Sequence, residues 1–98
     1  MARRIIKYSN RRLYDAAQAR TITLLELFEL VVKGEDVTVE WKGSGEDITA
    51  VTLLQAVLER LKRHPGESVA PVVLERLLAA ARSALNLGSE LESLTRSA

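Results

Sequence analysis

The residues best suited to chemistry in this chain are the cations and planar polar groups of its first fifteen positions. Lys7, Arg11 and Arg12 supply positive charge, whereas Tyr8 supplies an aromatic face and Asn10 an amide. Basic side chains interleaved with aromatic and amide groups are typical of surfaces that bind an anionic, partly stacked partner such as nucleic acid. The segment therefore predicts a nucleic-acid contact close to the N-terminus.

The charge of the chain is distributed unevenly. Residues 1–20 carry six basic side chains and one acidic side chain, a balance of +5, and residues 21–98 carry eight basic and twelve acidic ones, a balance of −4. The net charge of +1 therefore conceals a cationic end. Because attraction to a phosphate backbone depends on local charge, a nearly neutral chain can hold DNA through such an end.

The basic segment also has a purely structural interpretation. Basic side chains on an edge strand oppose strand-to-strand aggregation, the tyrosines suit the core of a small sheet, and Arg11 or Arg12 could pair with Asp15. Adjacent residues of a regular strand point to opposite faces, so only a turn or bulge lets both arginines reach one partner. The orientation of Arg11 and Arg12 therefore discriminates between the two interpretations.

The composition excludes several classes of chemistry. With no cysteine and one histidine, the chain has no disulfide and no thiolate or histidine-rich metal site. His64 precedes Pro65 and is interpreted as an exposed helix end. The segment 43–45 lacks the spacing of a phosphate-binding loop, and the adjacent Glu46 and Asp47 point apart in an extended segment. We therefore expect a protein that is not an enzyme and needs no cofactor.

The location of the protein follows from what the sequence lacks. No apolar run approaches the roughly 18–20 residues that span a bilayer. The charged start of the chain is not followed by the apolar segment of a signal peptide. A cytoplasmic protein with no membrane partner is expected.

The apolar pattern predicts an α+β fold: a small, mainly antiparallel sheet, two packed helices and a C-terminal helix for self-association. Strands are expected over residues 3–8, 12–14 and 37–41. Ser9 and Asn10 favour a turn between the first two strands, which makes them a hairpin.

Two helices are expected to pack on this sheet. Thr23 and Glu26 fit a capping box at the start of a helix over residues 24–33. A second helix begins near residue 50 and ends near residue 63, before Pro65. Its apolar positions recur at helical spacing and predict its buried face, which consists of Val51, Leu54, Leu58 and Leu61, broadened by Leu53 and Val57.

A third helix is expected over residues 70–87, with Gly88 and Ser89 as its end or hinge and residues 89–96 only marginally helical. An alanine–leucine face late in a small chain is typical of a self-association surface, and the alternative is that the helix folds back over the sheet. The expected oligomerisation residues are Leu74, Leu77, Leu78, Ala81 and Leu85.

The sequence predicts two parts, because Pro65 and Gly66 set the third helix apart from the unit before it. Residues 1–64 form a compact domain, and residues 65–98 form a C-terminal helical oligomerisation segment. This boundary favours association of the third helix with another chain over folding back.

Three blocks of the compact part resemble the N-terminal DNA-binding domain of polyhydroxyalkanoate synthesis regulators. The blocks are Lys7–Asp15, Ile22–Leu24 and Gly45–Thr49, and the similarity covers roughly residues 3–63. The chain departs from the family motif at Ser9, where a proline is common, and at Ala16, where a threonine is common. Every charged and aromatic group of the motif is retained.

The resemblance implies a bacterial, cytoplasmic transcriptional regulator, expected to be a repressor of polyhydroxyalkanoate synthesis or granule-associated genes that acts as a homo-oligomer. Its partners would be double-stranded promoter DNA, a second copy of itself and the polymer granule surface. Arginines would contact phosphates or guanine, and Asn10 would read adenine. The expected DNA-binding residues are Arg3, Arg4, Lys7, Tyr8, Asn10, Arg11, Arg12 and Tyr14.

Two alternatives stay open. The same basic hairpin could dock an acidic protein, which would make the chain a non-enzymatic interaction and oligomerisation module. The leucine-rich helix over residues 70–87 could instead adsorb to an apolar granule. The salt dependence of DNA binding discriminates the first alternative from a DNA regulator.

Overall fold

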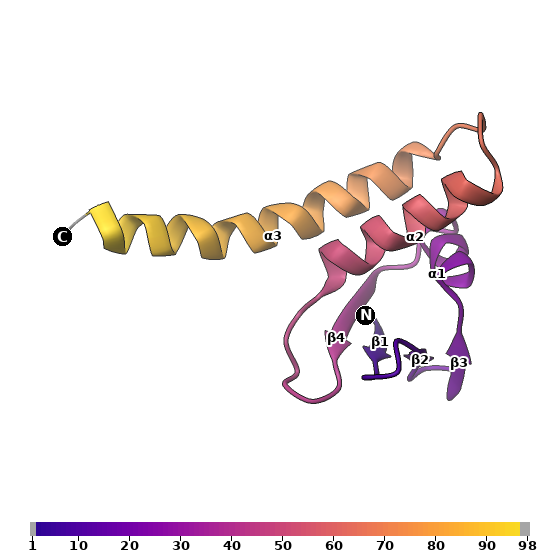
Figure 1. Ribbon diagram of the computed structural model, residues 1–98, viewed down its shortest axis with the longest axis horizontal. Coiled ribbons are helices and arrows are strands. Elements are labelled where there is room, and N and C mark those ends of the chain that lie inside the picture. The colour runs from indigo at the N-terminus through magenta and orange to yellow at the C-terminus, as the bar shows by residue number, and fades with distance from the viewer. Residues whose placement is uncertain (1, 97–98) are drawn as a thin grey trace.

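The part of the chain that the structure describes folds into four strands and three helices (Figure 1). A computed structural model describes the backbone of residues 2–96 and the side chains of residues 2–84. The expected α+β fold is confirmed. The elements, in order, are β1 Arg3–Lys7, β2 Leu13–Asp15, β3 Arg20–Ile22, α1 Leu24–Val32, β4 Val37–Trp41, α2 Thr49–Arg63 and α3 Pro71–Arg96.

The strands form one mostly antiparallel sheet in the order β3-β2-β1-β4. β2 pairs antiparallel with β1 and with β3, whereas β4 lies parallel to β1. The parallel pair arises because α1 carries the chain from the β3 edge to the β4 edge, the kind of crossover that parallel strands require. Ile5 stands at the centre, opposite Asp15 on one side and Val39 on the other.

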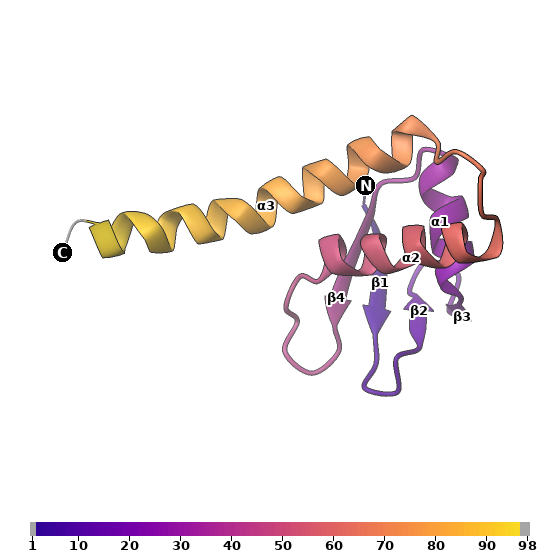
Figure 2. The ribbon, with the colours of Figure 1, turned by 45° about the horizontal axis from the view of Figure 1, so that its top comes forward.

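The core lies between one face of the sheet and the three helices, which Figures 1 and 2 show on the same side of the sheet. Alternate residues of a strand point to opposite faces, so one set of strand residues is buried and the other faces away from the helices. We call the second face the open face of the sheet. The buried apolar residues are Ile5, Leu13, Ile22, Leu27, Phe28, Val31, Val37, Val39, Leu53, Ala56, Val57, Val73 and Ala80.

The capping box at the start of α1 is confirmed. The Thr23 hydroxyl accepts a hydrogen bond from the Glu26 amide at 3.1 Å, and the Thr23 amide donates to the Glu26 carboxylate at 3.2 Å. These two bonds satisfy amide groups that have no partner within the helix.

Replacing Thr23 by alanine is expected to lower the free energy of unfolding by about 1 kcal/mol, because the Glu26 amide loses its acceptor. Urea denaturation followed by circular dichroism measures this change. Thr23→Ser is the matched control, because it keeps the acceptor and should stay close to wild type. An equal loss in both variants would show that the hydroxyl bond is not what stabilises this end of α1.

The predicted buried face of α2 is wrong at its four main positions, whereas the burial expected of Leu53 and Val57 is confirmed. Leu53, Ala56 and Val57 are buried, as are Thr49 and Thr52. The side chains that were expected inside are largely exposed: Val51 by 49%, Leu54 by 47%, Leu58 by 50% and Leu61 by 38%. α2 carries two apolar stripes, and helical spacing does not show which of them faces the sheet.

Thr49 provides the physical reason for the orientation of α2. Its hydroxyl accepts a hydrogen bond from the Val39 amide at 2.9 Å, which fixes the first turn of α2 against β4. Thr52 is satisfied within the helix, since its hydroxyl donates to the Ile48 carbonyl at 2.8 Å. Thr49, Thr52 and Ala56 are small side chains that let α2 approach the sheet closely, and Leu53 fills the core between them.

α3 packs against α1 and α2, within the helical layer (Figure 2). Val73 and Ala80 are buried there, and the Arg76 side chain donates to the Val37 carbonyl and pairs with Asp36. The helix continues to Arg96, although an end or hinge was predicted at Gly88. A single glycine costs a helix only about 1 kcal/mol, which is not enough to end it.

Candidate nucleic-acid interface

The β1–β2 hairpin turn is held by backbone bonds and by the side chain of Asn10. The Tyr8 amide donates to the Arg12 carbonyl and the Arg11 amide to the Tyr8 carbonyl, both at 2.9 Å. The Asn10 side-chain oxygen accepts from the Arg12 amide at 3.1 Å. Arg11 adopts a φ of 67°, a conformation uncommon for residues other than glycine.

This turn interrupts the alternation of the strand at Arg11 and Arg12. Both residues are exposed, and neither forms an ion pair with any residue that the structure describes. The structural interpretation in which one of them pairs with Asp15 is therefore wrong. Two cations at the tip of the hairpin remain available to an anionic partner.

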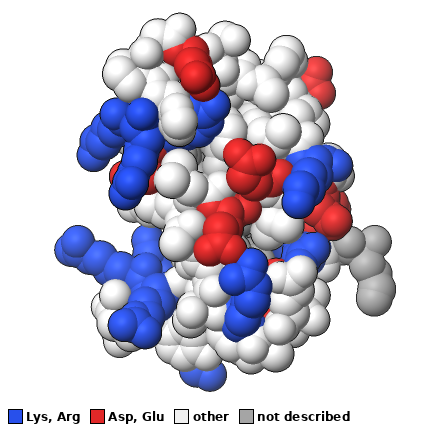
Figure 3. All heavy atoms as spheres, turned by 90° about the vertical axis from the view of Figure 1, so that its right-hand side faces the viewer, with Lys and Arg blue, Asp and Glu red and all other residues white. Residues whose placement is uncertain are grey.

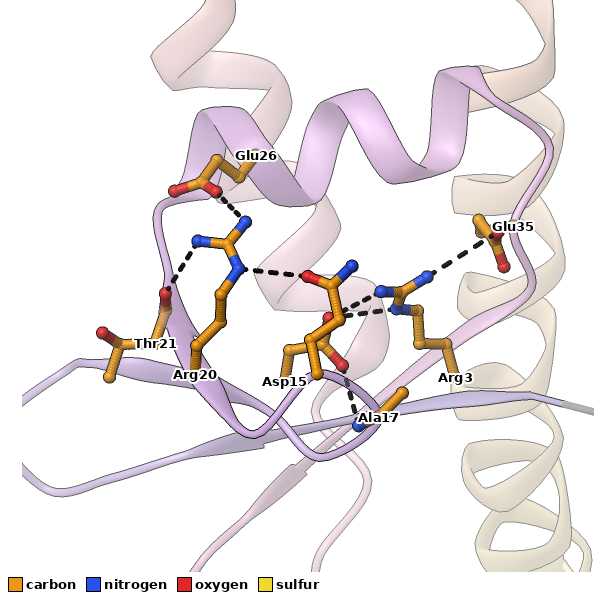
Figure 4. Close-up of polar contacts among 8 residues, drawn as sticks. Arg3, Asp15, Ala17, Arg20, Thr21, Glu26 and Glu35 are labelled. Carbon is orange, nitrogen blue, oxygen red and sulfur yellow. Dashed lines mark hydrogen bonds and ion pairs between the residues drawn. The ribbon is translucent and has the colours of Figure 1, made fainter.

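Arg3 is the partner of Asp15 (Figure 4). Its Nε and Nη2 lie 3.0 and 2.9 Å from Asp15 Oδ2, and Nη1 lies 3.7 Å from Glu35 Oε1. Only 15% of the Arg3 side chain and none of the Asp15 side chain is exposed. Arg3, which was expected to bind DNA, thus fastens β1 to the end of β2.

The carboxylate of Asp15 is buried and charged. Burial alone would raise its pKa, but the hydrogen bond from Arg3, those from the amides of Ala17 and Gln18, and the positive charge of Arg3 outweigh burial and lower it. The Ala17 amide lies 3.0 Å from Asp15 Oδ1. Hydrogen bonds to a charged form favour that form, so the pair is a structural anchor.

The open face of the sheet holds three other predicted residues. Tyr8 and Tyr14 contact each other edge to face, with ring centroids 6.3 Å apart and planes at 87°. Arg4 pairs with Glu40 of β4, which neutralises its charge locally. Lys42 lies over the Tyr8 ring, with its Nζ 5.5 Å from the centroid, and adds a cation to this face.

A basic groove lies between the hairpin and α2. It has a volume of about 500 Å³ and contains three cations, Lys7, Arg11 and Lys62. Lys7 Nζ donates to Gln55 Oε1 at 3.1 Å, a bond that links β1 to α2. The acid in the groove is Glu59, which accepts a hydrogen bond from Arg63 at 3.2 Å. We call this surface the basic groove.

The structure thus distributes the predicted residues over three neighbouring surfaces. Lys7 and Arg11 line the basic groove, Asn10 and Arg12 lie at the hairpin tip, and Arg4, Tyr8 and Tyr14 lie on the open face. In Figure 3, Lys and Arg side chains gather toward the left of the visible face, and most Asp and Glu side chains lie at its centre and right.

Sequence reasoning missed Lys42 and Lys62. Both are far from the basic segment along the chain and reach it through the parallel β1–β4 pairing and through the packing of α2 beside β1. The signal for Lys62 was its place in the strongly basic last turn of α2, which also holds Arg60 and Arg63.

The residues that the structure describes contain neither a cluster of metal-ligating side chains nor a helix suited to crossing a membrane. Among them, no group of three His, Cys, Asp or Glu side chains is placed to hold a metal ion. None of the helices in this part of the chain is both long and apolar enough to cross a membrane.

Comparison with known proteins places this architecture in a family. The family model of the PHB/PHA accumulation regulator DNA-binding domain matches residues 4–64, which contain α1, α2 and all of the sheet except Arg3. Over 55 residues the chain is 46% identical to an uncharacterized protein of Allochromatium vinosum, a match that covers 56% of this chain. The match spans only 36% of that relative's length. No solved structure matches. The chain belongs to the PHB/PHA accumulation regulator DNA-binding domain family, which is a family of DNA-binding regulator domains and not of enzymes.

Proposed function

We propose that this chain is a cytoplasmic transcriptional regulator that binds promoter DNA as a homo-oligomer and represses polyhydroxyalkanoate synthesis or granule-associated genes. The observation that carries the proposal is the pair of exposed cations, Arg11 and Arg12, at the tip of the hairpin. Family membership supports DNA as the partner. A hairpin of this kind is narrow enough to enter the major groove, which admits a two-stranded β-ribbon.

Each of the three surfaces would contact a different part of the DNA. Arg11 and Arg12 would reach phosphates or guanine at the tip, and Lys7 and Lys62 would hold the backbone along the basic groove. Lys42 and Tyr8 would contact the DNA strand that runs past the open face of the sheet. Phosphate contacts give affinity and base contacts give sequence preference.

Asn10 would contribute less to reading adenine than its residue type suggests. A bidentate contact to adenine uses both the oxygen and the nitrogen of the side-chain amide. In the hairpin turn the oxygen already accepts from the Arg12 amide, which uses one of its two lone pairs and holds the side chain against the turn. The role proposed for Asn10 is therefore chiefly to hold the turn that presents the two arginines.

The experiment that tests the proposal is a salt titration of binding to promoter DNA from a polyhydroxyalkanoate synthesis region. About four phosphate contacts per protomer predict a log–log slope of roughly −3.6 for one protomer and roughly −7 for a dimer. Scrambled DNA of the same length is the control for sequence preference. A slope near zero, or no binding by folded protein at low salt, would contradict the proposal and favour docking of the basic hairpin on an acidic protein.

Binding to the polymer granule is the second part of the proposed function, and α3 is its proposed site. Leu74 and Leu78 are exposed by 45% and 58% on α3, whereas Leu77 packs against the core and the Leu85 side chain lies outside the described residues. Co-sedimentation of the full chain with polymer particles would test it. Unchanged sedimentation of a Leu74→Glu/Leu78→Glu variant would exclude these leucines as the cause.

A further inference from the structure

The outer face of α2 carries an unpartnered row of apolar side chains. Val51, Leu54, Leu58 and Leu61 are each exposed by between 38% and 50%. We call this row the α2 stripe. Each member is a branched aliphatic side chain, and removing its exposed apolar area from water is favourable. Exposing four such side chains on one helix to water is unfavourable for a monomer.

The spacing of the stripe is that of a helix–helix seam. The intervals are three, four and three residues, which places its members at successive a and d positions of a heptad pattern. A helix that buries itself on one side and repeats a and d positions on the other is built to contact a second helix. Ala56 and Leu53, on the opposite side, contact the core instead.

Two leucines of α3 are also exposed, Leu74 by 45% and Leu78 by 58%. The Arg76 side chain reaches Val37 and Asp36, at the start of β4. Residues two positions apart are about 200° apart around a helix, so Leu74 and Leu78 lie on the side of α3 away from β4. Because α3 packs alongside α2 (Figures 1 and 2), these two leucines belong to the same helical layer as the stripe.

The size of this surface suits a modest dimer. The six half-exposed side chains on α2 and α3 present on the order of 500 Å² together, and the largest apolar patch on a typical monomer, which is often functional, is roughly 300–600 Å². A standard interface buries about 800 Å² on each partner, and polar residues around the patch would supply the remainder.

The charges at the two ends of α2 favour a second copy of this chain as the partner of the α2 stripe. Exposed Glu46 and Asp47 precede the helix, and exposed Arg63, which does not line the basic groove, ends it. In an antiparallel pair of α2 helices the acidic start of one copy meets the basic end of the other. Antiparallel packing also opposes the two helix dipoles, whereas parallel packing would place like charges together.

We infer that the α2 stripe is the seam at which two copies of this chain associate, with their α2 helices antiparallel across a twofold axis. This inference rests on the homo-oligomer part of the proposed function and moves its seam from α3 to α2. Leu54 of one copy packs on Leu58 of the other, and Val51 packs on Leu61. Leu58 also lines the basic groove, so dimerisation sets two basic grooves beside one seam.

The oligomeric state of the full chain without DNA tests the seam. Sedimentation equilibrium should give a dimer for wild type and a monomer for Leu54→Glu/Leu58→Glu, both with the same circular dichroism, since the substituted side chains are exposed. Leu74→Glu/Leu78→Glu is the control and should weaken the dimer less. A monomeric wild type, or a dimer lost in the α3 variant and kept in the α2 variant, would overturn the inference.

Cysteine cross-linking tests the geometry with conservative substitutions, because the chain has no cysteine of its own. Val51→Cys and Leu61→Cys chains, distinguished by mass, are mixed and oxidised. Positions 51 and 61 are separated by about 15 Å along the helix, so an antiparallel seam gives mainly the mixed disulfide. Disulfides mainly between identical chains would mean a parallel seam, and no disulfide at all would mean that the stripe is not the interface. Neither measurement includes DNA, so a failure of DNA binding leaves both results interpretable.

Discussion

Replacing Arg11 and Arg12 together by alanine is expected to weaken binding to promoter DNA by about 100-fold per protomer. A well-placed arginine contact to DNA is worth roughly 1–3 kcal/mol, and this change removes two of them. The salt slope should become shallower by roughly 1.8 for each protomer, because two phosphate contacts are lost. Fluorescence anisotropy with labelled promoter DNA over a range of salt concentrations measures both quantities.

The variant should keep its fold. The turn bonds at Arg11 and Arg12 are made by their backbone amides and carbonyls and by the Asn10 side chain. Alanine at position 11 has the same backbone strain as arginine at a φ of 67°, since both are L residues with a Cβ atom. Loss of binding would therefore report the guanidinium groups rather than a collapsed hairpin.

The matched control is Arg20→Ala/Lys33→Ala, which removes the same charge far from the hairpin tip. Arg20 lies on β3 and pairs with Glu26, and Lys33 follows α1. Binding should stay within about threefold of wild type, because a distant exposed charge is largely screened. An equal loss in the control and in the hairpin variant would mean that overall charge, and not the hairpin, holds the DNA.

The sequence was sufficient for the local features of the fold. The Thr23 capping box and the hairpin over the basic segment depend on residues within a few positions of one another, and both are present. The conformation of Arg11 was not predictable, because positive φ is a signal associated with glycine. It arises from the bonds of the whole turn.

Features that depend on pairing between distant segments were not predictable. Asp15 was considered as a partner of Arg11 or Arg12, and Arg3 was expected to contact DNA. The register that places Ile5 opposite Asp15 instead brings Arg3 and Asp15 together. Likewise, α2 offers two apolar stripes, and the bond from Val39 to Thr49 decides which one is buried. One sequence is compatible with either ion-pair partner for Asp15 and with either buried stripe of α2, and it does not show which of them forms.

Replacing Asp15 by asparagine is expected to lower the free energy of unfolding at pH 7 by about 2–3 kcal/mol. Breaking a buried ion pair by removing one partner costs roughly 3–5 kcal/mol, and the partly exposed Arg3 side chain lets water offset some of that loss. Asparagine has nearly the same shape and can still accept the hydrogen bond from the Ala17 amide. The change therefore reports the charge of the pair, and urea denaturation measures it.

The same pair predicts how stability depends on pH. The pKa of Asp15 is lowered in the folded chain, so its contribution is fully present above the unfolded value of about 3.9 and is lost as pH falls through the folded value. Wild type should therefore lose stability below about pH 4 more steeply than the Asp15→Asn variant. The pKa values of Glu26 and Glu67 are also lowered, by hydrogen bonds from Arg20 and Arg60, so some acid sensitivity should remain in both proteins.

A double-mutant cycle separates the ion pair from its surroundings. Arg3→Met keeps much of the packing of the arginine stem and leaves the carboxylate without its main partner, so it should also destabilise. Because the two groups contact each other directly, the double variant should be more stable than the sum of the single losses predicts. Glu26→Gln, at the exposed pair with Arg20, is the control and should cost less than about 1 kcal/mol. If the losses in free energy of unfolding at Arg3 and Asp15 were additive, each residue would stabilise the fold independently. Arg3 would then again be a candidate DNA contact.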